Sequence, residues 1–161
     1  MIDSLIKFLL VCVLLTIFLQ DVKERLVFWF LYPIVGILGY CIESNSIGYK
    51  MAMVNSLINL SFIIIVLFIL YIYSKFKLKT EFVNGSMGLG DILLLIFLGF
   101  TFSTLPFFIL FVFSLLFSLL LHLYFKDKSI HKDVPLAGYI SLFFSSIYLA
   151  SFFLPPKYLF S

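Results

Sequence analysis

The stretch Gly85-Ser86-Met87-Gly88-Leu89-Gly90-Asp91 stands directly before the apolar run Ile92–Leu98. It places a carboxylate at the entrance to a hydrophobic segment, after three glycines within six positions. An ionisable side chain at a membrane boundary is costly unless it has water, a partner or a function. Glycine has no side chain, so another part of the chain can approach closely here. We therefore expect Asp91 to be a functional residue that another segment meets at this point.

The composition predicts an integral membrane protein. Of the 161 residues, 63% are hydrophobic and only 12% are charged, and the mean hydropathy is +1.20. A soluble domain usually carries about a quarter charged residues. The 22 phenylalanines suit a surface that faces a lipid bilayer. The net charge of +3 is small and scattered, so nucleic acid is not an expected partner.

The two cysteines give no indication of a disulfide or a metal site. Cys12 and Cys41 lie in different apolar runs without CxxC spacing, and we interpret both as small buried hydrophobic residues. No cluster of histidine, cysteine and acidic residues has the spacing of a metal site. We expect neither a metal nor a cofactor.

Six apolar segments predict an all-α integral membrane protein, a single-domain bundle of six transmembrane helices over residues 1–161. The expected helices cover about residues 2–20, 26–42, 49–74, 91–102, 107–125 and 134–154. The first resembles a signal peptide in length, but it lacks a small-residue cleavage site, so we expect it to be retained. The fourth is short, because about 12 residues span roughly 18 Å against a bilayer core of about 30 Å. Asp91 is therefore expected in a water-accessible recess near or below the membrane interface.

Several residues within these segments have expected structural roles. Pro33 is expected to kink the second helix, and Tyr32 to anchor it at the membrane interface. Residues 43–46 are expected to form a short outer turn. Asn55 and Asn59 lie four apart on one helical face, and we expect them to form hydrogen bonds between helices rather than to bind a substrate.

The basic residues are divided unequally between the two sides of this bundle. The loops after the first, third and fifth helices carry eight of them, namely Lys23, Arg25, Lys75, Lys77, Lys79, Lys126, Lys128 and Lys132. The opposite side carries Lys7, Lys50 and Lys157. Because cytoplasmic loops are enriched in lysine and arginine, we expect those three loops in the cytoplasm and both termini outside. Asp21 and Asp91 then lie at the same cytoplasmic face of the cell membrane.

Two carboxylates at one membrane face are suited to peptide hydrolysis. Like charges repel in a poorly solvated site, so such a pair holds a single proton. The ionised member deprotonates a water that attacks the scissile carbonyl, and the protonated member donates to the carbonyl oxygen. We expect Asp21 and Asp91 to form this pair, which titrates as a unit. Taken singly, Asp21 would be an ordinary loop residue and Asp91 a helix cap.

Other nucleophilic schemes have less support in the sequence. His122 lies on a helix and His131 in a loop, and no serine or cysteine has an evident partnership with either. Four serines within helices are instead expected to bond to backbone carbonyls or to pack helices together, namely Ser114, Ser118, Ser145 and Ser146.

The element Gly88-Leu89-Gly90-Asp91 matches the GxGD motif of polytopic membrane aspartic proteases. That class includes type IV prepilin peptidases, archaeal preflagellin peptidases and presenilin-like proteases, and the chain resembles the prepilin peptidase branch along essentially its whole length. In this family a first aspartate follows helix 1 in a basic loop, where Asp21-Val22-Lys23-Glu24-Arg25 stands here. The family's last helix often opens with a run similar to Val134-Pro135-Leu136-Ala137-Gly138.

The resemblance implies a function and a set of site residues. Asp21 and Asp91 would be catalytic, and Gly88 and Gly90 would support the motif. The activity would be cleavage of the short basic leader from prepilin-like or preflagellin-like membrane proteins at the cytoplasmic membrane face, a step in type IV pilus assembly or protein secretion.

The sequence also departs from the family pattern. Leu93 stands where many members have lysine, and Leu26-Val27-Phe28 replaces a common Ile-Pro-Asn run. Larger members carry an N-terminal segment with paired CxxC motifs and also methylate the new N-terminus. The chain has no such segment, so we expect a peptidase-only form.

Two alternatives remain open at this point. The chain could be a GxGD protease with a different membrane-protein substrate. It could also be a non-catalytic scaffold or a small transporter subunit. A transporter would carry broken helices and polar groups near the bilayer midplane in both halves, and only Asn55 and Asn59 fit that pattern loosely.

Overall fold

The computed structural model describes residues 2–78, 87–125 and 134–153. This part of the chain is all-helical, and its helices follow in the order α1 (Ile2–Glu24), α2 (Leu31–Ile47), α3 (Tyr49–Tyr73), α4 (Leu89–Leu98), α5 (Thr104–Phe125) and α6 (Leu136–Ala150). A π-helical turn, η1 (Ser74–Leu78), continues α3.

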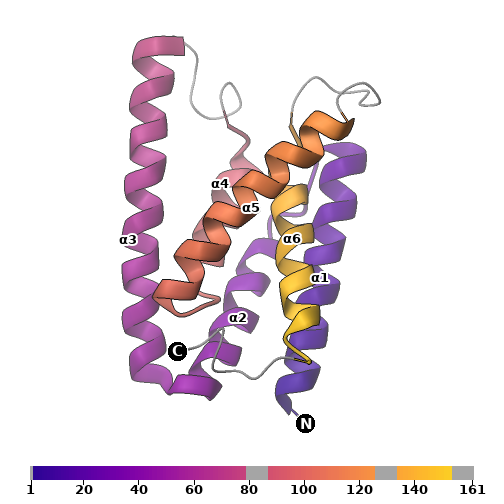
Figure 1. The fold of residues 1–161 in the computed structure, drawn as a ribbon, viewed down its shortest axis with the longest axis vertical. Coiled ribbons are helices and arrows are strands. Elements are labelled where there is room, and N and C mark those ends of the chain that lie inside the picture. Colours follow the sequence, from indigo (N-terminus) through magenta and orange to yellow (C-terminus); the bar gives the residue numbers. More distant parts are fainter. Residues whose placement is uncertain (1, 79–86, 126–133, 154–161) are drawn as a thin grey trace.

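The helices alternate in direction along the long axis of the bundle (Figure 1). α1 packs most extensively against α6 and then against α2, while α5 crosses α6 on its other side. α3 stands at the opposite edge and contacts α2, α4 and α5. The short α4 lies behind α5 in this view and packs against α2. This arrangement brings the end of α1 close to the start of α6.

The outer surface has the character of a transmembrane protein. Three helical stretches are long and apolar enough to cross a membrane, over Ile2–Glu24, Tyr49–Lys77 and Thr104–Phe125. α4 and α6 are shorter apolar helices. Large apolar side chains on α3, such as Ile64 and Phe68, are more than half exposed. An apolar surface of this extent suits lipid rather than water.

The first helix ends later in the chain than expected, and the second helix begins later. α1 continues to Glu24, so Asp21 lies in its last turns and not in a loop. Arg25 has a φ of 57°, in the left-handed region where helices commonly end. α2 begins at Leu31, which places Pro33 in its first turn. Proline is tolerated there because the first N–H groups of a helix have no intrahelical acceptor. Pro33 therefore removes no helical hydrogen bond, and the reason for expecting a kink in α2 does not apply.

The expected outer turn at residues 43–46 is wrong, because α2 continues to Ile47. Glu43 is fully buried. It accepts hydrogen bonds from the Asn55 side-chain amide at 2.9 Å and from the Ser103 hydroxyl at 3.4 Å. The chain turns instead at Gly48, whose φ of 86° favours glycine.

Hydrogen bonding between helices by the two asparagines is confirmed. The Asn59 amide donates to the carbonyls of Gly99, at 3.2 Å, and Phe102, at 2.9 Å. The Thr104 hydroxyl donates to Asn55 Oδ1 at 3.1 Å. The last carbonyls of a helix have no intrahelical donor, and here Asn59 donates to carbonyls at and beyond the end of α4. These bonds join α3 to the connection between α4 and α5.

The expectation for the helical serines is also confirmed. Each donates to a backbone carbonyl three or four residues earlier in its own helix, as seen for Ser114, Ser118, Ser145 and Ser146. The expected burial of both cysteines is wrong for Cys12, which lies on the outer face of α1 and is exposed. Cys41 is half-buried, and both cysteines are free thiols.

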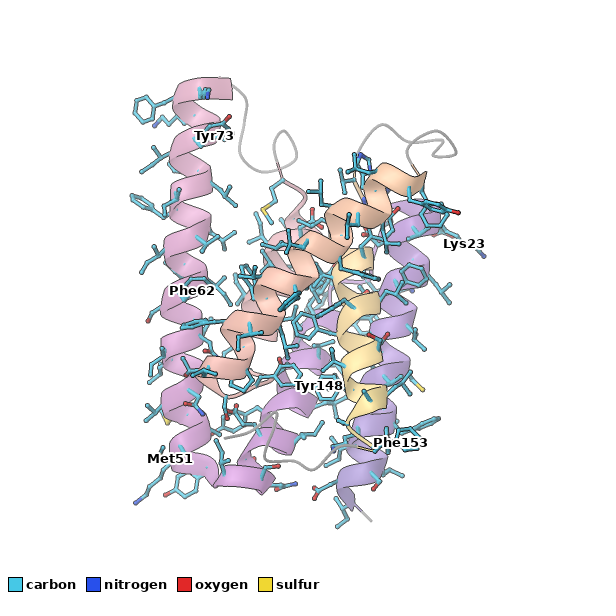
Figure 2. The ribbon with its side chains drawn as sticks, in the orientation of Figure 1. Lys23, Met51, Phe62, Tyr73, Tyr148 and Phe153 are labelled. Carbon is cyan, nitrogen blue, oxygen red and sulfur yellow. The ribbon has the colours of Figure 1, made fainter. Side chains whose placement is uncertain are left out.

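Some of the expected topology lies outside the described residues. This applies to the loop at 126–133 with its three lysines and His131, to Lys79, and to Lys157. Among the labelled side chains, Lys23 and Tyr73 lie toward one end of the bundle, and Met51 and Phe153 lie toward the other (Figure 2). The ends of α1 and α3 therefore share one end of the molecule.

Candidate active site

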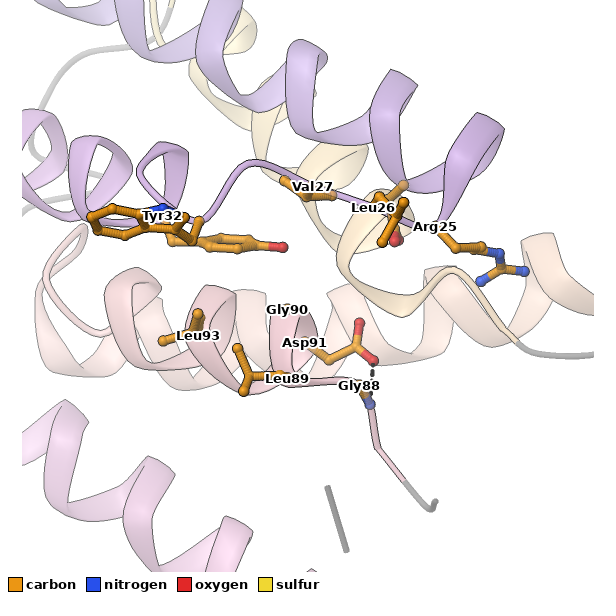
Figure 3. A pocket seen from close by; sticks show the side chains of 11 residues that line it. Arg25, Leu26, Val27, Tyr32, Gly88, Leu89, Gly90, Asp91 and Leu93 are labelled. Atoms are coloured by element: carbon orange, nitrogen blue, oxygen red, sulfur yellow. Dashed lines mark hydrogen bonds between the residues drawn. The ribbon is translucent and has the colours of Figure 1, made fainter. Parts of the chain in front are cut away.

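A pocket of about 250 Å³ lies between the α1–α2 connection and the start of α4 (Figure 3). Asp21 and Asp91, the two carboxylates singled out in the sequence, both line it. Its other lining residues are Arg25, Leu26, Val27, Trp29, Tyr32, Gly88, Leu89, Gly90 and Leu93. The structure thus brings together all four residues of the expected site.

Asp91 enters the pocket from the first turn of α4 and is half-buried. Its Oδ2 accepts a hydrogen bond from the Gly88 backbone N–H at 3.2 Å (Figure 3). The Gly88 carbonyl in turn accepts from the N–H groups of Asp91, at 3.1 Å, and Ile92, at 3.2 Å. Asp91 therefore helps to close the start of its own helix. Its other oxygen, Oδ1, accepts from the Ala137 N–H at 2.7 Å.

Asp21 faces the same pocket from the end of α1 and is only 9% exposed. Its Oδ2 accepts a hydrogen bond from the Gly138 backbone N–H at 2.6 Å. A carboxylate near the C-terminus of a helix lies at the negative end of the helix dipole, which is unfavourable. The short bond to Gly138 offsets that cost with a donor from another helix.

Both carboxylates are therefore bound by the start of α6. Ala137 and Gly138 are its second and third residues, and their N–H groups are among the four that a helix leaves without an intrahelical acceptor. The positive end of the α6 dipole adds about 0.3–1 kcal/mol for a carboxylate there. Because the two donors are consecutive in the chain, Asp21 and Asp91 are held side by side, within range of electrostatic interaction.

Small residues are required where these segments meet. A Cβ added to Gly138 would lie 3.0 Å from Asp21 Oδ2 and 3.2 Å from Asp21 Cβ. A Cβ added to Gly90 would collide with the Tyr32 hydroxyl. The second glycine of the GxGD motif thus makes room for a side chain of α2.

Tyr32 is a pocket residue and not the interface anchor that we expected. Its side chain is 2% exposed, and its ring extends along the pocket with the hydroxyl toward Asp91 (Figure 3). The reason is the later start of α2, which turns Tyr32 inward while Trp29 stays in the preceding connection, 72% exposed.

Arg25 places a positive charge beside the pair. It lies directly after α1, its backbone N–H bonds to the Asp21 carbonyl at 3.3 Å, and it lines the pocket. Its guanidinium interacts electrostatically with both carboxylates. An adjacent cation reduces the cost of keeping one of two neighbouring carboxyls ionised.

Comparisons of this chain with family models, curated proteins and solved structures find no match. The geometry of the pocket is therefore the basis for a function. Among the described residues, no group of three or more histidine, cysteine and acidic side chains could hold a metal ion. What the pocket offers is two adjacent carboxyls, an adjacent cation and a phenol.

Sequence reasoning missed Tyr32 and the backbone donors of Ala137 and Gly138. The donors could have been sought in the run 134–138, because a proline followed by small residues is typical of a helix start. No feature of the sequence indicated that this helix start would meet the two aspartates. Tyr32 had no distinguishing signal, since aromatic residues near helix ends are common in membrane proteins.

Proposed function

We propose that this chain is a membrane aspartic endopeptidase of the type IV prepilin peptidase kind. Its substrates would be prepilin-like or preflagellin-like membrane proteins, from which it removes the leader peptide. The observation that supports this most strongly is that Asp21 and Asp91 line one pocket and bind to consecutive N–H groups of α6.

The hydrogen-bonding pattern suits a shared proton and an attacking water. Asp91 has a backbone donor on each oxygen, whereas Asp21 Oδ1 has no hydrogen-bond donor among the described residues. Because Asp21 lines the pocket, its Oδ1 would hold the attacking water or the proton that the pair shares. The pair would deprotonate the water as it attacks the peptide carbonyl, and protonate the leaving amine afterwards.

The location of the pocket agrees with cleavage at the cytoplasmic membrane face. The pocket lies near the end of α1, at the end of the bundle where Lys23 and the end of α3 are found. Lysines are enriched on the cytoplasmic side of membrane proteins. We therefore propose six spans in the cell membrane with both termini outside and the active site toward the cytoplasm.

The lining of the pocket fits a substrate that is itself embedded in the bilayer. Leu26, Trp29 and Leu89 line the pocket and are each more than half exposed at its edge. Apolar residues at the edge would allow a hydrophobic helix of the substrate to lie alongside while its extended leader junction enters the pocket and meets the two carboxyls. Lipid would otherwise cover this edge.

Co-expression with a candidate prepilin tests the proposal, with leader removal followed by gel shift. Asp21→Asn and Asp91→Asn keep the shape of the side chain but remove the shared-proton chemistry, and each should lower cleavage by about 10²-fold or more. Asp3→Asn is the matched control, because Asp3 is exposed and far along α1 from the pocket. Cleavage that survives either pocket substitution would show that the pair is not catalytic.

A further inference from the structure

A second group of buried polar side chains lies away from the pocket, between α2, α3 and the α4–α5 connection. It is centred on Glu43, which is 0% exposed. Tyr32 and Glu43 are both on α2, and their separation of 11 positions corresponds to about 16 Å along the helix. The proposed peptidase mechanism does not use this group.

Three polar atoms of this group are buried and have no hydrogen-bond partner in the described part of the chain. They are Glu43 Oε2, Ser56 Oγ and Asn59 Oδ1. Ser56 and Asn59 share the buried face of α3, and their side chains are 3% and 0% exposed. A buried polar atom without a partner costs about 1–3 kcal/mol, and more where it is charged.

The hydrogen bonds of the group place the three residues around one region, where α2, α3 and the α4–α5 connection meet. Glu43 Oε1 accepts from Asn55, the residue before Ser56, and from the Ser103 hydroxyl. Asn59 donates to the carbonyl of Phe102, the residue before Ser103. Glu43 and Asn59 thus bond, from two helices, to the neighbouring residues Ser103 and Phe102.

The bonded donors of this group are directed to atoms other than these three. The Asn55 amide is used by Glu43, the Asn59 amide by two carbonyls and the Thr104 hydroxyl by Asn55. Tyr148 on α6 interacts electrostatically with Glu43, but its hydroxyl donates to the Thr101 carbonyl. None of these donors bonds to the remaining carboxyl oxygen or amide oxygen, and the Ser56 hydroxyl, which could donate, bonds to neither. A cation would satisfy all three oxygens at once.

We propose that Glu43, Ser56 and Asn59 form a buried site for a monovalent cation, Na⁺. The three free atoms are all oxygens, the ligands preferred by hard cations. A single carboxylate neutralises one positive charge, whereas a divalent ion would leave a net charge in a low-dielectric interior. A proton on Glu43 would compete with the ion for the same oxygen, so binding of Na⁺ and protonation of Glu43 would exclude each other.

Carbodiimide labelling of the purified full-length protein in detergent tests the site directly. The hydrophobic reagent dicyclohexylcarbodiimide reacts with protonated buried carboxyls, and mass spectrometry of the peptide containing Glu43 reports the rate at this residue. Na⁺ at ten times its dissociation constant should slow labelling of Glu43 roughly tenfold. Choline at the same ionic strength should leave the rate unchanged. Labelling of Asp21 and Asp91 in the same sample should not respond to Na⁺, which separates this site from the pocket.

Variants and a stability measurement complete the test. Ser56→Ala should weaken protection by Na⁺ at least several-fold, whereas Ser61→Ala should not, because Ser61 is exposed and bonds only within α3. Na⁺ should raise the unfolding temperature of the wild type and not that of Glu43→Gln, in which an amide supplies the missing donor. Na⁺ that neither slows labelling of Glu43 nor raises the unfolding temperature of the wild type would overturn the proposal. So would an equal rise in Glu43→Gln.

Discussion

Asp21 and Asp91 are distant in sequence, yet they accept hydrogen bonds from neighbouring backbone N–H groups, those of Gly138 at 2.6 Å and Ala137 at 2.7 Å. The helix start that donates these bonds fixes the distance between the carboxyls, because consecutive N–H groups in the first turn of a helix have a set spacing. Side-chain rotamers alone would not impose this constraint. The arrangement predicts that small changes at the start of α6 will affect activity more than stability.

Gly138→Ala should reduce leader cleavage by roughly 10²-fold, because displacement of a reacting group by about 1 Å can have an effect of that size. The added Cβ would lie 3.0 Å from Asp21 Oδ2 and would push the carboxyl away from its donor. Gly99→Ala is the matched control. Its Cβ would be similarly crowded, 3.0 Å from Cδ1 of the buried Ile63 and 3.2 Å from the Ile96 carbonyl oxygen, but it would meet neither carboxyl. Cleavage by both variants in the co-expression assay, at equal protein levels, checks the prediction.

Gly90→Ala should impair both folding and cleavage, and Tyr32→Phe should restore much of the loss. The clash at position 90 is with the Tyr32 hydroxyl, whereas the ring carbon that bears it would be 3.5 Å away, an ordinary contact. Overpacking of this kind costs about 1–3 kcal/mol. The unfolding temperatures of the two single variants and the double variant form a cycle that isolates the interaction. Additive losses in that cycle would contradict the contact between these residues.

The sequence alone predicted the bounds of those helices whose ends are marked by residues next to them in the chain. The expected helix at 49–74 matches α3 closely, because Gly48 at its start and the lysines beyond its end interrupt the apolar pattern. The interhelical role of Asn55 and Asn59 was likewise predictable, since a buried amide between apolar helices needs a partner.

The continuation of α1 through Asp21 and of α2 through Glu43 was not predictable, because both residues depend on partners far along the chain. A run of polar residues after an apolar segment usually marks a loop. Here Gly138 binds Asp21, and Asn55 and Ser103 bind Glu43, so both acidic residues remain helical and buried. The pair Asp21 and Asp91 could be proposed from the sequence because carboxylates are distinctive, whereas every residue but proline carries a backbone N–H.

Asn59→Ala should lower the free energy of unfolding by about 1–3 kcal/mol, because it leaves the carbonyls of Gly99 and Phe102 without their donor. Denaturant unfolding in detergent without Na⁺ measures this loss separately from any effect of the ion. Asn45→Ala is the control, since Asn45 is exposed and its bond to Asp3 is at the surface, where a change of less than about 0.5 kcal/mol is expected. Equal losses in the two variants would mean that the buried hydrogen bonds of Asn59 stabilise the protein no more than the surface bond of Asn45.

Gly39→Ala should destabilise the protein more than Gly36→Ala, although both glycines lie on the face of α2 that packs against α4 and the residues after it. Small residues let membrane helices approach closely, and the cost of a methyl group depends on what it meets. At Gly39 the new Cβ would collide with the Thr101 side chain and lie 3.0 Å from the Thr101 backbone Cα.

Thr101 is fully buried and cannot retreat, because its carbonyl accepts the Tyr148 hydroxyl and its own hydroxyl bonds to Leu98. At Gly36 the nearest atom is Cδ1 of Phe97, at 2.8 Å, and that half-buried ring can rotate away. We expect a loss of about 1–3 kcal/mol for Gly39→Ala and a clearly smaller one for Gly36→Ala in the same unfolding assay. Equal losses would mean that Phe97 is held as rigidly as the Thr101 backbone, and that the interface between α2 and α4 cannot adjust at either glycine.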